Sequence, residues 1–130
     1  MKLSKNFTLS EFTKSATAKL NNIDNTISVV ALSRVQYLVR NLLQPLRDKY
    51  GKPLTVSSGY RCEKLNKAVG GVPTSQHTKG EAADVKCDNP IALLDVLLHS
   101  GLEFDQAILY PTFLHLSIKE GGNRKMVIRK

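Results

Sequence analysis

Apolar residues recur at helical spacing in the first half of the chain. Between residues 28 and 49 they repeat every three or four positions, which predicts an amphipathic helix with one buried face. Pro45 lies inside this stretch, so we expect the helix to kink or divide there. Gly51 and Pro53 are its stop signals. The repeating positions are Val35, Leu38, Val39, Leu42 and Leu46.

Shorter helices are expected on both sides of this stretch. Thr8 followed by Glu11 is a capping-box pattern, which opens a helix over about residues 9–17. A second short helix is predicted over about 62–68, before a loop rich in Gly and Pro. Asn89 and Pro90 have the character of an N-cap and a first helical position, and Gly101 ends the helix that they begin.

The remaining apolar runs are short and predict strands. They cover about residues 54–58, 83–86, 104–109, 113–118 and 125–129. Residues 110–112 turn the third strand into the fourth, and residues 121–123 turn the fourth into the fifth. Helices come first and a mainly antiparallel sheet dominates the end, so the pattern predicts an α+β fold. The length fits a single domain over residues 1–130.

The charge balance favours anionic partners. The formal net charge is +8, but the basic residues are spread along the chain without a long basic block. This is typical of a soluble surface with a basic bias, which suits the anionic polymers of a bacterial wall. With no Trp and only 6% aromatic residues, the chain lacks the stacking platform of a single-strand nucleic-acid binder. We therefore expect no specific nucleic-acid partner.

The sequence carries little information on cellular targeting or on disulfide pairing. The first residues lack the apolar stretch of a signal peptide, and no run is long enough for a membrane span. We expect a soluble chain made in the cytoplasm without an export signal. Cys62 and Cys87 are not in CxxC spacing; a structural pair is possible, but reduced thiols fit the pattern better.

Two of the three histidines have neighbours that point to chemistry. His99 ends an amphipathic helix and is most simply a solvated residue that favours the helix dipole. Asp84 opens a short apolar strand, where a buried carboxylate is costly unless it is paired or bound to a metal. His115 lies in a strand between two leucines, so its ring also needs a partner. With His77 they form a normal ligand set for catalytic zinc, although satisfied core histidines stay open from spacing alone.

Several short segments together resemble the M15 family of zinc peptidases. The resemblance is closest to the small D-alanyl-D-alanine carboxypeptidase-like branch of bacteria and phages, and it covers about residues 7–117. The most specific segment is the SxHxxGxAxD element. The segments are LLQPLRDKYGKPL (42–54), SGYR (58–61), Asn66, VGG (69–71), SQHTKGEAAD (75–84), FDQ (104–106) and HLS (115–117).

The resemblance implies a function and a site. It implies a hedgehog/DD-peptidase-like fold whose sheet carries a zinc cleft, with Zn²⁺ held by His77, Asp84 and His115. Arg61 would hold a substrate carboxylate or steady the oxyanion, as a forked guanidinium can. Ser75 would hydrogen-bond substrate or cap its loop. The implied reaction is hydrolysis of D-amino-acid-containing peptide bonds of peptidoglycan, after release of the protein to the cell wall.

The catalytic base is where the sequence departs from the family pattern. Relatives generally carry a carboxylate shortly before the last His, but residues 106–114 contain none, and Tyr110 or Thr112 takes that neighbourhood. Asp105 is the nearest upstream carboxylate, with Glu81 and Glu120 as weaker candidates.

The place of Asp105 depends on the register of one hairpin. If Pro111 centres the hairpin, residue 107 faces 115, and Asp105 becomes a diagonal neighbour of His115 at about 7–8 Å. A slip of one residue would move Asp105 to the opposite face, where it would be a structural carboxylate. The missing carboxylate also leaves a second function open, that of a zinc-containing wall-binding domain that has lost hydrolysis.

Overall fold

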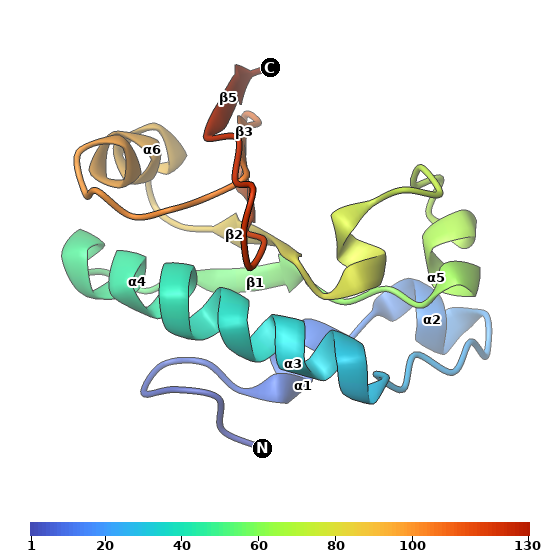
Figure 1. Cartoon of the computed structure of the whole chain (residues 1–130). Coiled ribbons are helices and arrows are strands. Elements are labelled where there is room, and N and C mark those ends of the chain that lie inside the picture. The colour runs from blue at the N-terminus through green and yellow to red at the C-terminus, as the bar shows by residue number, and fades with distance from the viewer.

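Helices dominate the first half of the chain, and four of the five strands of the single sheet lie in the second half (Figure 1). This computed structural model describes residues 1–130, and it confirms the predicted α+β class. The helical elements are α1 (Leu9–Thr13), α2 (Ala16–Leu20), α3 (Val29–Leu38), η1 (Val39–Leu43), α4 (Gln44–Tyr50), α5 (Glu63–Ala68), η2 (Gln76–Lys79) and α6 (Pro90–Leu98). The strands are β1 (Thr55–Ser58), β2 (Ala82–Lys86), β3 (Gln106–Leu109), β4 (Leu114–Ser117) and β5 (Met126–Arg129).

The long helix survives its internal proline through a change of hydrogen bonding. α3, η1 and α4 form one rod along the sheet (Figure 1). The η1 segment is a π turn, in which the N–H of Gln44 donates to the carbonyl of Val39, five residues back. Because proline has no N–H and crowds the preceding turn, a widened turn before Pro45 accommodates it without a break. Gly51 ends the rod in a left-handed conformation, with φ of 76°.

The N-terminal helix is shorter than the sequence predicted. The capping box of Thr8 and Glu11 is present, but α1 ends at Thr13, where Lys14 is extended. The hydroxyl of Ser15 then accepts a hydrogen bond from the N–H of Ala18 and begins α2. A second N-cap therefore divides the predicted helix over residues 9–17 into two short ones.

The sheet has the strand order β1-β2-β4-β3-β5, and only the last pair is parallel. The turn at residues 121–123 does lead into β5, but β5 does not form a hairpin with β4. The segment between them is closed by Asn123, which exchanges two hydrogen bonds with the backbone of Lys119. It crosses to the far side of β3, where the N–H of Met126 donates to the carbonyl of Asp105. The sheet is thus antiparallel except at this edge.

The helical rod and α6 share one hydrophobic core with the sheet. Every second residue along β2 and β4 points into that core and is fully buried, namely Ala83, Val85, Leu114 and Leu116. The residues between them, including Asp84, emerge on the opposite face. No helix has the length and apolar character needed to cross a lipid bilayer. The two cysteines are free and half-buried.

Candidate metal centre

Strand pairing brings Asp84 and His115 face to face. Asp84 of β2 is the direct antiparallel partner of His115 of β4, so their side chains emerge on the same face of the sheet. The Nδ1 atom of His115 lies 2.9 Å from Oδ1 of Asp84. Leu114 and Leu116 point into the core on either side, which anchors the strand that presents His115. Two residues 31 apart in sequence are therefore fixed by sheet register alone.

A short loop brings His77 to the same place. His77 lies in η2, which begins at Ser75, whose hydroxyl accepts a hydrogen bond from the N–H of His77. The loop leaves η2 through Gly80, with φ of 78°, and a Cβ there would lie 2.4 Å from the carbonyl oxygen of Ala31. Only glycine permits this close approach to α3. The packing holds His77 with only 3% of its surface exposed.

The hydrogen bond of His77 determines which of its nitrogens is free. Its Nδ1 lies 2.7 Å from the backbone carbonyl of Gly59. Because a carbonyl only accepts, Nδ1 carries the proton and Nε2 presents a lone pair. That Nε2 faces Asp84, 3.4 Å from Oδ1. Metal-ligating histidines commonly show this arrangement, in which one ring nitrogen donates to a backbone carbonyl and the other is free to bind the metal.

The geometry of the three side chains fits a small divalent cation. One donor atom from each of His77, Asp84 and His115 lies within 4.8 Å of the other two. Bond lengths of about 2.0–2.1 Å at a tetrahedral zinc place two donors about 3.3 Å apart, and the two closest pairs here are comparable. Burial by itself would raise the pKa of Asp84, but hydrogen bonds and charge from His115 and His77 hold it well below its usual range. The carboxylate is therefore ionised, as a metal ligand must be.

Arg61 and Ser75 border the cluster. The backbone N–H of Arg61 donates to the carbonyl of His77, which ties the SGYR segment to the His77 loop. The guanidinium makes one side-chain contact, from Nη2 to Oγ of Ser75 at 3.4 Å, and its Nε is buried without a partner. Burial lowers the pKa of Arg61, and the charge of Asp84 partly offsets that effect. Arg61 forms no ion pair, so its forked face is not occupied by a carboxylate of the protein.

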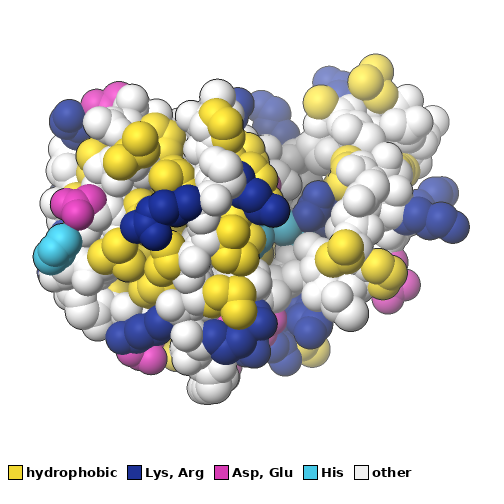
Figure 2. Space-filling view, turned by 90° about the horizontal axis from the view of Figure 1, so that it is seen from above, with side chains coloured by type: hydrophobic (Ala, Val, Ile, Leu, Met, Phe, Trp, Pro, Cys, Tyr) yellow, Lys and Arg dark blue, Asp and Glu magenta, His cyan; other side chains and the backbone are white.

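The cluster lies in a cleft of about 450 Å³. A groove with a histidine at its floor is visible in Figure 2, with Lys and Arg side chains along both of its edges. Besides the cluster, Arg61, Ser75, Gln76, Gln106, Tyr110 and Arg124 line it. Tyr110 stacks on Phe113 with ring centroids 4.5 Å apart. Among the lining residues, Asp84 is the only carboxylate.

Asp105 does not reach the cleft, because the hairpin register differs from the expected one. The N–H of Tyr110 donates to the carbonyl of Phe113, so the turn is centred between residues 111 and 112 rather than on Pro111. Ile108, not residue 107, is therefore the partner of His115. This one-residue shift corrects the expected diagonal contact between Asp105 and His115.

The structure gives the Asp105 carboxylate another partner. It is fully buried and accepts hydrogen bonds from Nε and Nη2 of Arg124 at 3.0 and 2.8 Å. Glu81 is also engaged, in an ion pair of 2.7 Å with Arg34. Glu120 is exposed and lines none of the cavities described here. None of the three carboxylates considered from sequence lines the metal cleft.

One supporting residue gave no signal in the sequence. The amide of Asn25 donates to the carbonyls of Thr13 and Tyr60 and accepts from the N–H of Cys62. It thereby ties the N-terminal segment to both ends of the loop that carries Arg61. An asparagine in a polar stretch normally predicts a turn, so only its burial reveals this role.

Comparison with known proteins gives the class of this fold and site. Residues 5–117 match the family model described as Peptidase M15. The match spans well over half of the chain, and the chain belongs to the Peptidase M15 family, whose members are metal-dependent peptidases. The matched range agrees with the range of about residues 7–117 over which the sequence motifs resemble that family. A search of curated proteins finds no significant match.

Proposed function

We propose that this protein is a zinc-dependent peptidase that hydrolyses D-amino-acid-containing peptide bonds of peptidoglycan, as a D-Ala-D-Ala carboxypeptidase or an endolysin. The observation that carries the proposal is the convergence of His77, Asp84 and His115 in one cleft, with donor atoms within 4.8 Å of each other. The net charge of +8 supports a target in an anionic wall, which the protein would reach after release.

In this proposal the three side chains are the zinc ligands. Zinc bound there would lower the pKa of its water to about 7 and polarise the scissile carbonyl. The carbonyl of Gly59 holds the ring of His77 in the tautomer whose Nε2 is free to bind. The strand pairing fixes Asp84 and His115 independently of the loop. The site is therefore preorganised by two separate parts of the fold.

Arg61 is proposed to bind the substrate. Its Nε is buried without a partner, and its guanidinium lines the same cleft as the cluster. A substrate carboxylate, or the oxyanion formed during hydrolysis, would accept from this fork and relieve the unpaired donor. Ser75 caps η2 and contacts Arg61, so it holds the guanidinium in place and can also donate to substrate.

A second function is favoured by one observation. The cleft contains no carboxylate besides Asp84, so no second Asp or Glu is placed to accept the proton of the attacking water. This supports the alternative of a zinc-containing wall-binding domain that has lost hydrolysis. Tyr110, which lines the cleft, occupies the neighbourhood in which relatives carry the carboxylate.

Hydrolysis of a peptide ending in D-Ala-D-Ala tests the proposal. We expect turnover that a chelator abolishes, that added zinc restores, and that His115→Ala lacks. The control is His99→Ala, because His99 is exposed and outside the cleft, and it should behave as wild type. Zinc-dependent binding to purified peptidoglycan without hydrolysis would favour the second function. Absence of both activities in zinc-loaded protein would contradict the proposal.

A further inference from the structure

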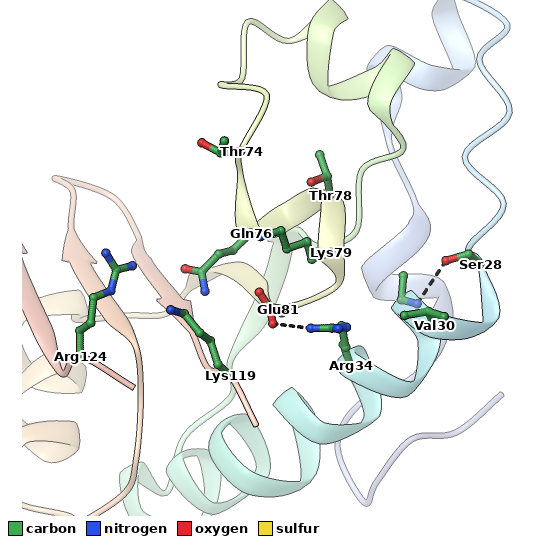
Figure 3. A pocket seen from close by; sticks show the side chains of 11 residues that line it. Ser28, Val30, Arg34, Thr74, Gln76, Thr78, Lys79, Glu81, Lys119 and Arg124 are labelled. Atoms are coloured by element: carbon green, nitrogen blue, oxygen red, sulfur yellow. Dashed lines mark hydrogen bonds and ion pairs between the residues drawn. The ribbon is translucent and has the colours of Figure 1, made fainter. Parts of the chain in front are cut away.

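A second cavity adjoins the metal cleft. It has a volume of about 550 Å³ and lies between α3, the η2 loop and the segment that follows β4 (Figure 3). Thr74, Gln76 and Arg124 line both hollows, so the two spaces meet along these side chains. A molecule bound in the cleft would therefore reach the cavity past only these three side chains.

The cavity has an excess of positive charge. Its lining contains one carboxylate, Glu81, which is already paired with Arg34. The side-chain ammonium of Lys79 forms no ion pair and no hydrogen bond with the rest of the protein. Lys119 lies 3.8 Å from Asp105, a carboxylate that Arg124 already engages through two nitrogens. The cationic residues of the lining are Arg34, Lys79, Lys119 and Arg124.

An unpartnered amide marks the place where a ligand would bind. Both Nε2 and Oε1 of Gln76 are buried without a hydrogen-bond partner. A buried amide left without hydrogen-bond partners loses its hydration without compensation, so such a group normally has a partner. In Figure 3 the Gln76 amide extends between the η2 loop and Lys119, with Arg124 beyond it. The amide N–H and the lysine ammonium are both donors, and an anion would satisfy them together.

We propose that this cavity binds a carboxylate carried by a side group of the peptide substrate, at a distance from the bond that is cut. The cavity and the cleft share Arg124, so one extended peptide can occupy both. Arg61 and this cavity then engage two different anionic groups of one substrate. The inference rests on the proposed function only in taking a wall peptide as the occupant of the cleft.

The test compares two peptides that differ in one carboxylate. The probe is L-Ala-γ-D-Glu-L-Lys with an amidated C-terminus, and its partner has the free α-carboxylate of the glutamyl residue converted to an amide. Binding to zinc-loaded protein is followed by NMR chemical shifts, which require no turnover. A charge-assisted hydrogen bond is worth about 1.5–3 kcal/mol, so the acid should bind about tenfold more tightly or better. Its largest shifts should be at Gln76 and Lys119.

Lysine variants separate the cavity from the overall charge. Lys119→Gln and Lys79→Gln should each remove most of the difference between the two peptides. Lys49→Gln is the matched control, because Lys49 is exposed on α4 and lines neither hollow. Equal affinity for both peptides, or the same effect from Lys49→Gln, would overturn the inference. Because this readout is binding, it can fail while D-Ala-D-Ala hydrolysis is intact, and it can succeed if the domain does not hydrolyse.

Discussion

Replacing Asp105 with Asn should lower stability and leave the chemistry of the cleft unchanged. Asp105 is fully buried, and its carboxylate accepts from the backbone N–H of Arg124 as well as from two nitrogens of the guanidinium. Asn keeps the shape of the side chain but turns one acceptor into a donor, which then faces the donors of Arg124. The substitution therefore removes a charge-assisted pair that is closed to solvent on the aspartate side.

The size of the loss follows from the pKa of Asp105. Hydrogen bonds from Arg124 lower that pKa from 3.8 to about 2, against the opposing effect of burial. A pKa lowered from 3.8 in the unfolded chain to about 2 in the folded protein corresponds to about 2–3 kcal/mol at neutral pH. Because the folded pKa is the lower one, this stabilisation is complete above the unfolded pKa, near 4. It is lost as the pH falls from about 4 through about 2.

Urea unfolding followed by circular dichroism measures this contribution. At pH 7 we expect Asp105→Asn to lower the free energy of unfolding by about 2–3 kcal/mol, and the difference from wild type should shrink toward pH 2. The control is Glu103→Gln, because the Glu103–Lys125 pair is exposed and worth under about 1 kcal/mol. Turnover per folded molecule at saturating substrate should stay at the wild-type level. Lost hydrolysis with unchanged stability would refute this account and restore Asp105 as the base.

Three further changes test the cleft. Tyr110→Glu places a carboxylate on the lining of the cleft. Because a positioned general base contributes about 10²–10⁴-fold, we expect hydrolysis of a D-Ala-D-Ala peptide to rise at least tenfold. No gain would show that the cleft does not lack a base. Gly59→Ala puts a Cβ 2.7 Å from the backbone of Phe12, which displaces the carbonyl that orients His77. The zinc affinity of Gly59→Ala, measured by competition with a chelator, should fall about 10–100-fold. The control is Gly121→Ala, which should keep the wild-type zinc affinity because Gly121 has open space around it. Equal zinc affinities of the two variants would contradict the role of the Gly59 carbonyl. Removing zinc should lower the thermal midpoint, since metal at about 100 times its Kd adds about 2.7 kcal/mol of stability, and an unchanged midpoint would argue against a site in the folded protein.

Local signals in the sequence predicted most elements, whereas the residues of the cluster were singled out by the resemblance to the M15 family. Alternation around His115 predicted that its ring lies on the face opposite Leu114 and Leu116, which the structure confirms, and the direct pairing of the strands places Asp84 on that same face. Hairpin register could not be predicted, because centring the turn on Pro111 or half a residue later changes which residue faces His115. A difference that small has no signature in residue type.

Features that depend on long-range packing were outside the reach of sequence patterns. The parallel pairing of β5 with β3 depends on where the segment after β4 crosses the sheet. The cationic cavity is assembled from α3, the η2 loop and that same segment, which are separate in the chain. Lys79 and Lys119 read as ordinary surface lysines until the fold places them on one cavity. The unpartnered amide of Gln76 likewise becomes visible only in three dimensions.

The metal content of the purified protein shows whether His77, Asp84 and His115 hold an ion. Mass spectrometry under native conditions, with zinc supplied and excess removed, counts the ions bound to each chain. We predict one zinc per chain in wild type and in His99→Ala, and almost none in His115→Ala. If wild-type protein binds no zinc, or if His115→Ala still binds one zinc per chain, the claim that His77, Asp84 and His115 form a metal centre is contradicted.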